Sequence, residues 1–386
     1  MNASRYCAES EKKSLKKLLE EESSGSEKKP KRQRRFSPWL IWTLIAILAV
    51  ILTVMVVMVL PLINKKAGHT ALIRVPEHAT EEMLHDTIAK YLGDDFASGC
   101  MKAMVIISGS DDIFRHGAYR IDEGMTPFSA ARQIARGGQA GIDVKLNGQR
   151  TKQDVAKLLA SKLEASEDDF MEAFNDSVLL DKYRTDPEHV LCLFFEDTYE
   201  FYWTASPEDV IKKMYDNYAD FWTPERVERA EDLKLLPRGA YILASIVDAE
   251  TNQSSEKGTI GQLYINRLVR DMPLQADPTL VYAMNDFSIT RVTSEMKKVD
   301  SPYNTYMYKG LPPGPIRLTS TATVDAILTA RPHDYLFMCA SDKMDGTHNF
   351  TVTLEEHNQN AKRYQQKQDE LGNTVNAQNQ ASFGSK

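Results

Sequence analysis

The sequence predicts an α+β chain with three parts: a single N-terminal transmembrane helix, a small α+β module and a larger, mainly helical α+β domain. Three observations support this prediction. An almost wholly apolar run occupies residues 39–60. Short strand-like and helix-like patterns then alternate up to residue 147. From Thr151 onward, apolar residues recur mostly at helical spacing behind a series of N-cap residues.

The apolar run is long enough to cross a bilayer once. The residues from Trp39 to Leu60 span about 33 Å at the helical rise. The preceding segment, residues 28–35, is strongly basic. The positive-inside rule therefore predicts a cytoplasmic N-terminus, a signal anchor over residues 37–63 in contact with membrane lipid, and export of all that follows. A cleaved signal peptide is disfavoured because the run is too long for an ordinary h-region and no small-residue cleavage site follows it.

Charge is distributed unevenly along the 386 residues. Up to Phe36 there are eleven Lys or Arg and six Asp or Glu, whereas the whole chain has a formal charge of −7, so the remainder carries −12. We expect residues 1–36 to form a disordered cytoplasmic tail with one short helical segment near Leu15–Leu19. The acidic remainder argues against a nucleic acid partner, because it lacks a basic surface to neutralise phosphates.

Cysteine and histidine spacing predicts neither a disulfide framework nor a metal or cofactor site. Cys7 would be cytoplasmic, which leaves an odd number of cysteines outside: Cys100, Cys192 and Cys339. Cys192 and Cys339 lie in apolar runs and are expected to be buried thiols.

The module over residues 67–147 is expected to contain four short strands and two helices. Thr80 and Thr126 are N-cap candidates, and the helices they begin would end at Gly93 and Gly137. The expected strands are Ala71–Val75, Ala103–Ile107, Gly117–Ile121 and Ile142–Leu146.

The domain over residues 148–365 is expected to be mainly helical. Thr151 with Asp154 predicts a capping box, and Ser206-Pro207 and Thr223-Pro224 predict two more helix starts. Later elements are expected as helices over residues 243–251, up to about 270, and 318–330, and as a hairpin of strands 335–340 and 348–353. Residues 366–386 are rich in Gln, Asn and Ser, and we expect a frayed polar tail.

Glu250 is the most informative single residue. Read as a helix, the segment Leu243–Thr251 places Glu250 on the same stripe as Leu243, Ile246 and Val247. Desolvation raises the pKa of such a carboxyl, and enzymes accept this cost when they need an acid that is protonated near neutral pH. The alternative is a buried glutamate paired with an arginine such as Arg267. Asp248 lies roughly opposite on the helix and is expected to face away from the site, in solvent.

Two polar loops follow this helix. In the first, Gln275, Asp277 and Thr279 fit a turn that exposes polar groups, because Pro278 biases Asp277 away from helix. The second loop offers aromatic rings and polar groups suited to stacking on sugars and hydrogen-bonding to them: Tyr303, Asn304, Thr305 and Tyr306. By composition alone, each would be only a loop.

Four segments together, in order and spacing, resemble the endolytic murein transglycosylases of the YceG-like family. The resemblance covers roughly residues 70–365, and the segments are 243–251, 272–279, 301–306 and 310–316. It implies a membrane-anchored lytic transglycosylase in which Glu250 is the catalytic residue. The enzyme would cut the MurNAc–GlcNAc bonds of nascent peptidoglycan strands, leave a 1,6-anhydroMurNAc end and terminate strand elongation beside peptidoglycan synthases. It needs no cofactor.

The resemblance also assigns supporting roles. Gln275, Asp277, Thr279 and residues 303–306 would bind substrate, and His348 matches a Gly-x-His-x-Phe element and would support them. Residues 67–147 resemble a LysM-type glycan-binding module through a Gly-x-Tyr-Arg element, although a spacer is an equal alternative.

The chain departs from the family pattern at two places. Glu196 stands where Pro is usual, and Arg317–Ser320 stands where Asn-Pro often follows. Asp197 and Tyr199 would either line the cleft or satisfy buried backbone.

Two other functions remain open. One is a wall-binding scaffold without catalysis. The other is a hydrolytic muramidase with Asp197 or Asp277 as its second carboxylate.

Overall fold

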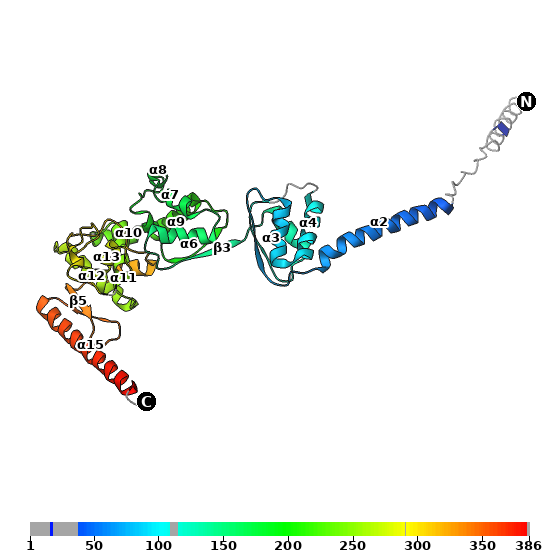
Figure 1. Cartoon of the computed structure of the whole chain (residues 1–386). Helices are drawn as coiled ribbons and strands as arrows, with labels where there is room; N and C mark the ends of the chain where they lie inside the picture. The colour runs from blue at the N-terminus through cyan, green and yellow to red at the C-terminus, as the bar shows by residue number, and fades with distance from the viewer. Residues whose placement is uncertain (1–15, 18–37, 109–114, 290, 384–386) are drawn as a thin grey trace, which may run out of the picture. The chain divides into compact units, whose positions relative to one another are not determined.

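The computed structural model describes residues 16–17, 38–108, 115–289 and 291–383 (Figure 1). It divides into two compact units, Met1–Asn64 and Lys65–Lys386. Most of the N-terminal tail, including the expected helix near Leu15–Leu19 except for two residues, lies outside the described residues.

The first unit contains the long apolar helix that the sequence predicts. Helix α2 spans Pro38–Asn64, and its part Pro38–Val57, with a mean hydropathy of 3.0, is long and apolar enough to cross a membrane. The side chains of this part are not buried against protein. Such a surface suits a lipid environment, in which a helix satisfies all its own backbone groups.

The second unit begins with a two-stranded antiparallel sheet and three helices. Strand β1 pairs with β2 so that Ile73 lies opposite Tyr119. Thr80 and Thr126 accept hydrogen bonds from backbone N–H groups as helix caps, which confirms these two helix starts. The elements are β1 (Ala71–Val75), α3 (Glu81–Leu92), α4 (Asp94–Ser108), β2 (Gly117–Ile121) and α5 (Pro127–Arg136).

The strand expected at Ala103–Ile107 is wrong, because these residues belong to α4. The buried positions on this helix recur at helical spacing, as Phe96, Cys100, Ala103 and Met104 show. A short apolar run alone does not distinguish a strand from the end of a buried helix.

Strand β3 (Gly141–Leu146) pairs antiparallel with β4 (Asp197–Tyr202), which lies more than fifty residues later. Val144 lies opposite Tyr199, and both pack in a core with Val155 and Leu159. The strand expected at the end of the small module therefore packs with the helices that follow it. These are α6 (Lys152–Lys162), α7 (Glu167–Ala173), α8 (Ser177–Asp181), the 3₁₀ helix η1 (Val190–Leu193) and α9 (Pro207–Phe221).

Local signals account for several helix starts in this part. Thr151 with Asp154 and Ser206 with Asp209 form capping boxes, and Thr223 caps a third helix. In each box, the side chains of the two residues reciprocally bond the backbone N–H groups of the first turn.

A second core surrounds helix α11 (Pro237–Glu250). Every residue of α11 from Ala240 to Asp248 is buried. Helix α12 lies close to α14, because a Cβ added at Gly258 would lie 2.7 Å from the carbonyl oxygen of Ala326. The other helices of this core are α10 (Pro224–Asp232), α12 (Ser254–Val269), α13 (Asp277–Ala283) and α14 (Thr321–Leu328). The 3₁₀ helix η2 (Met296–Lys298) has no buried residue.

The backbone around Glu196 is joined to the loop after residue 316. The Glu196 N–H donates to the carbonyl of Thr319, and the Glu196 carboxylate accepts from the N–H of Gly148 and from Arg317. Phe195 and Thr319 also form an isolated parallel bridge. The two departures from the family pattern thus contact each other.

The chain ends with a hairpin and a long helix. Strands β5 (Phe337–Ala340) and β6 (His348–Thr351) pair antiparallel, with Gly346 at φ 77° in their connection. Helix α15 spans Leu354–Phe383. The expectation of a frayed tail from residue 366 is therefore wrong up to Phe383. Gln, Glu, Lys and Ala are good helix formers, and a polar composition does not by itself exclude a helix.

Candidate functional site

Glu250 is the last residue of α11. The helix ends there because Thr251 adopts an extended conformation, with φ −143°. Tyr264 of α12 is buried and donates a hydrogen bond of 2.7 Å to Oε1 of Glu250. Among the described residues, no other hydrogen bond reaches the Glu250 carboxyl group, so Oε2 is available to a ligand.

The surroundings of Glu250 favour its protonated form. Burial raises the pKa of its carboxyl group to about 7, the hydrogen bond from Tyr264 lowers this pKa, the negative charge of Asp277 raises it, and the positive charge of Arg267 lowers it. A carboxyl group with a pKa near 7 can both donate and accept a proton at neutral pH, as a general acid and base must.

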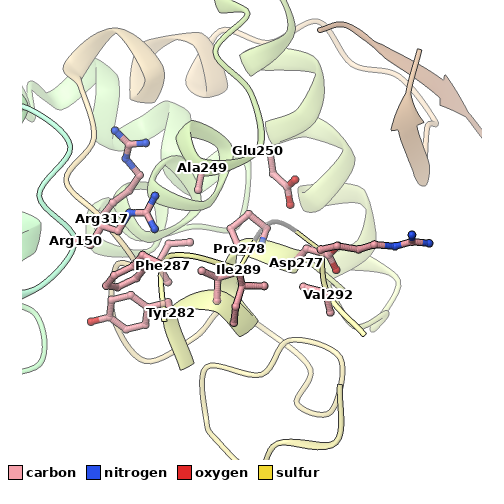
Figure 2. A pocket seen from close by; sticks show the side chains of 13 residues that line it. Arg150, Ala249, Glu250, Asp277, Pro278, Tyr282, Phe287, Ile289, Val292 and Arg317 are labelled. Carbon is pink, nitrogen blue, oxygen red and sulfur yellow. The ribbon is translucent and has the colours of Figure 1, made fainter. Parts of the chain in front are cut away.

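Two cavities meet at Glu250 and Asp277, which line both of them. The first has a volume of about 300 Å³ and the second about 470 Å³. Figure 2 shows the first cavity, with the Glu250 side chain extending from the end of α11 towards Asp277 and Pro278. A chain-like ligand that occupied both cavities would pass the Glu250 carboxyl group.

The first cavity combines aromatic and cationic side chains. Tyr282 and Phe287 lie on one side of it, and Arg150 and Arg317 come from segments distant in sequence (Figure 2). The Cζ atom of Arg150 lies 4.5 Å from the centre of the Phe287 ring.

The second cavity contains four of the residues expected to bind substrate: Gln275, Asp277, Tyr306 and His348. Tyr306 donates a hydrogen bond from its hydroxyl to Oδ1 of Asp277. His348 is fixed by Glu256, whose carboxylate bonds both the His348 backbone N–H and Nδ1 at 2.8 Å.

The other four expected residues line neither cavity. Thr279 and Thr305 are buried and hydrogen-bonded to each other at 2.8 Å. The buried Asn304 donates to the carbonyls of Lys297 and Val299, and the Tyr303 ring packs against the Tyr282 ring in a tilted arrangement. These side chains hold the two loops together, and they position Asp277 and Tyr306 rather than contacting the cavities.

Asp248 is not in solvent, so this expectation is wrong. Its side chain is 5% exposed, pairs with Lys257 at 2.7 Å and accepts hydrogen bonds from Thr319 and Thr323. It does face away from the cavities, towards α12 and α14. Its charge is tolerated because a lysine and two hydroxyls compensate it.

Arg267 does not form an ion pair with Glu250 among the described residues. Its guanidinium group donates to the carbonyls of Leu336, Pro273 and Leu274. The alternative of a Glu250–Arg267 structural pair is therefore wrong, because backbone carbonyls occupy the guanidinium group.

Asp197 and Tyr199 line neither cavity. Tyr199 is buried and donates to the carbonyl of Phe195, which matches the interpretation that it satisfies buried backbone.

Sequence reasoning missed Tyr264 as a partner of Glu250 and Arg150 as a cavity residue. Tyr264 lies on the apolar stripe of α12, where its spacing predicts only packing. Arg150 precedes the capping Thr151 and carries no motif. Within the described ranges, no group of three or more His, Cys, Asp or Glu residues is arranged to hold a metal ion.

Two relatives with the same name are similar to this chain. The chain is 30% identical over 267 residues to the endolytic murein transglycosylase of Bacillus subtilis, which is 65% of this chain and 73% of that protein. It is 30% identical over 122 residues to the protein of the same name from Streptococcus pneumoniae serotype 2, but these cover 31% of this chain and 22% of that protein.

Similarity extends to a solved structure and to a family. The crystal structure of a YceG-like protein from Listeria monocytogenes matches with a TM-score of 0.50 and 23% identity, covering 75% of this chain and 98% of that chain, which supports the fold. The sequence model of the YceG-like family matches residues 75–363, and the chain therefore belongs to the YceG-like family.

Proposed function

We propose that this chain is a membrane-anchored endolytic lytic transglycosylase. It would cut the glycosidic bond between MurNAc and GlcNAc in nascent peptidoglycan strands and leave a 1,6-anhydroMurNAc end. Family membership and the names of the relatives support the reaction class. The observation that carries the proposal is Glu250, a partly buried carboxyl group with a pKa raised to about 7 where two cavities meet.

In this mechanism Glu250 acts twice. Its protonated carboxyl first gives a proton to the glycosidic oxygen that leaves C1 of MurNAc. The resulting carboxylate then takes the proton from the 6-hydroxyl of the same sugar, whose oxygen bonds to C1 and closes the 1,6-anhydro ring. Water is not consumed, and Glu250 ends protonated, ready for the next cut. A positioned acid and base of this kind contributes roughly 10²–10⁴ in rate.

Tyr264 supports these two proton transfers by orienting Glu250. Its hydroxyl holds Oε1, so that Oε2 is the oxygen free to exchange a proton with substrate. The hydrogen bond also limits how far burial raises the pKa of Glu250, because it favours the carboxylate.

The cavities on both sides of Glu250 fit an endolytic cut. An enzyme that removes single terminal units needs room mainly on one side of the broken bond, whereas an internal cut requires sugar sites on both sides. We assign the first cavity to one flank of the strand and the second, with Gln275, Tyr306 and His348, to the other.

The anchor would confine this activity to new strands at the outer face of the cytoplasmic membrane, beside peptidoglycan synthases, where a cut terminates strand elongation. The proposal rests on α2 for the membrane crossing and on the basic segment 28–35 for the cytoplasmic N-terminus. Within residues 67–147, the Tyr of the Gly-x-Tyr-Arg element, Tyr119, is buried, whereas Arg120 is exposed. Arg120 is thus the residue of that element open to glycan.

The test is product analysis with the full-length protein in detergent. Uncrosslinked glycan strands are incubated with the wild type and with Glu250→Gln, and the fragments are identified by mass spectrometry. We expect fragments with 1,6-anhydro ends, each one water lighter than a hydrolysis product, and none with the variant. Binding without cleavage by the wild type would instead indicate a wall-binding scaffold.

One observation favours a second candidate, a hydrolytic muramidase. Asp277 is exposed, lines both cavities with Glu250 and interacts with it electrostatically. In a hydrolase it would serve as the second carboxylate, as base or nucleophile. Asp277→Asn distinguishes the two, because a hydrolase would release reducing ends and lose nearly all activity with this change. A lytic transglycosylase would keep anhydro products.

A further inference from the structure

The first cavity has a cationic end whose ligand the cleavage mechanism does not specify. Arg150 and Arg317 both line this cavity (Figure 2). Their segments are joined directly, because the N–H of Leu318 donates to the carbonyl of Gln149 at 2.8 Å. Glu250 and Asp277 line the same cavity and come from other elements, the end of α11 and the start of α13.

Arg317 is largely committed to the protein. Its guanidinium group donates to the carbonyls of Leu318 and Asp248 and forms a 3.0 Å ion pair with Glu196. The charges of Arg317 and Glu196 thus offset each other, and Arg317 lines the first cavity with its guanidinium group held by the protein.

Arg150 is different, because no carboxylate in the described part of the chain forms an ion pair with it. Among the described residues its guanidinium group has one recorded interaction, with the face of the Phe287 ring at 4.5 Å. A guanidinium group has five N–H donors, and its attraction to a ring face uses none of them as a hydrogen bond to a carboxylate, so donors of Arg150 can bond a ligand. A fork of this kind matches the two oxygens of a carboxylate.

The charge of this group suits an anionic substituent of the strand rather than the sugar being cut. Arg150 shares the first cavity with Glu250 but belongs to the segment before α6, outside the helices that carry Glu250 and Tyr264. Sugars themselves are uncharged, whereas peptidoglycan strands carry short peptides with free carboxylates. A guanidinium group without a carboxylate partner in the protein gains charge-assisted hydrogen bonds from such an anion.

We propose that Arg150, which lies over the Phe287 ring in the first cavity, binds a peptide carboxylate carried by the glycan strand. This inference rests on the proposed function for the identity of the strand. It makes Arg150 a specificity-determining residue, which distinguishes strands with charged peptides from strands with neutral ones.

The experiment compares two glycan strands that differ only in their peptide carboxylates, which are free in one and converted to primary amides in the other. The full-length protein in detergent is tested as wild type, Arg150→Gln and Arg150→Lys. We expect Arg150→Gln to raise KM about tenfold for the carboxylate strand, with kcat nearly unchanged and little change for the amide strand. Arg150→Lys should recover part of the loss, since it keeps the charge without the fork.

Arg229→Gln is the matched control. Arg229 is an exposed arginine of α10 that pairs with Glu225 and lines neither cavity, so this variant removes the same charge from elsewhere. Equal effects of Arg150→Gln on both strands, or of Arg229→Gln and Arg150→Gln on the carboxylate strand, would overturn the inference.

Binding separates this inference from the proposed function. Affinities of both strands are measured with Glu250→Gln alone and combined with Arg150→Gln. If the wild type cuts neither strand, the proposed function fails, yet an Arg150-dependent preference in binding would still support the carboxylate site. Equal affinities for the two strands would refute that site whether or not cleavage occurs.

Discussion

Glu250 keeps its proton at pH values between 4.5 and about 7, where an exposed glutamate would be ionised. Ionising Glu250 within the fold therefore lowers the stability of the folded state. In the unfolded chain its pKa is the ordinary 4.5, and in the fold it is about 7. Between these values the folded state binds more protons than the unfolded state, so the free energy of unfolding falls as pH rises. The stabilising contribution is complete below the unfolded pKa and is lost as pH rises through 7.

We therefore expect Glu250→Gln to gain stability relative to the wild type as pH rises. Glutamine does not titrate, so the difference should be small near pH 5 and reach about 1–3 kcal/mol at pH 8. Thermal unfolding of the full-length proteins between pH 4 and pH 9 measures it. Parallel stability curves for the two proteins would mean that Glu250 has an ordinary pKa.

Tyr264 should set the pH range of activity. Tyr264→Phe removes the hydrogen bond that lowers the pKa of Glu250, while the buried ring remains. The pKa should therefore rise, and the upper limb of the kcat/KM profile should move to higher pH. Loss of orientation should also reduce kcat about tenfold. The pH profile is measured on soluble glycan strands. A reduced rate with the upper limb at its wild-type pH would show that Tyr264 contributes only to packing.

At the scale of helices, the site depends on how closely α12 approaches α14. A Cβ at Gly258 would lie 2.7 Å from the carbonyl oxygen of Ala326, a backbone atom that has no rotamer to change. Gly258→Ala should push the helices apart and destabilise the protein by about 1–3 kcal/mol. Because α12 also carries Tyr264, cleavage should slow.

Gly68→Ala is the control for this substitution. A Cβ at Gly68 meets nothing within 4 Å, and the backbone there does not require glycine. The melting temperature and cleavage rate of Gly68→Ala should equal those of the wild type. A Gly258→Ala protein as stable as this control would show that α12 and α14 can separate without cost.

The sequence predicts those elements that depend on local chemistry. Thr80, Thr126 and Thr151 begin helices because each side chain bonds an N–H within its own first turn. Pairing between distant segments has no such local signal. Strand β3 pairs with β4, more than fifty residues later, and no residue near either strand predicts that register.

The same distinction applies to the site. Glu250 could be predicted because its conflict with an apolar stripe is visible in the sequence, and Asp277 and Tyr306 because a motif contains them. Asn304 could not be assigned correctly from the sequence, because its amide bonds carbonyls whose positions depend on the path of the loop. Arg150 enters the cavity only through tertiary packing.

At the scale of the whole molecule, the chain joins two units of different kinds. The boundary lies between Asn64 and Lys65. The second unit holds its own first residues in place. The N–H of Ala67 donates to the carbonyl of Met125, and the carbonyl of Ala67 accepts from the N–H of Gly124. The second unit also contains the whole site, from Arg150 to His348. The apolar helix and the candidate site therefore lie in different units.

We expect residues 65–386, produced alone, to fold and to cut soluble glycan strands at a rate close to that of the full chain. The cleavage rates of the truncated protein and the full chain should differ on strands attached to lipid vesicles. There the full chain, inserted in the same bilayer, is held near its substrate, and tethering of this kind raises the apparent affinity by roughly 10²-fold or more. Cleavage rates of both proteins on both substrates measure the effect. If the truncated protein cuts vesicle-bound strands as fast as the full chain, the helix α2 does not direct the enzyme to membrane-attached substrate.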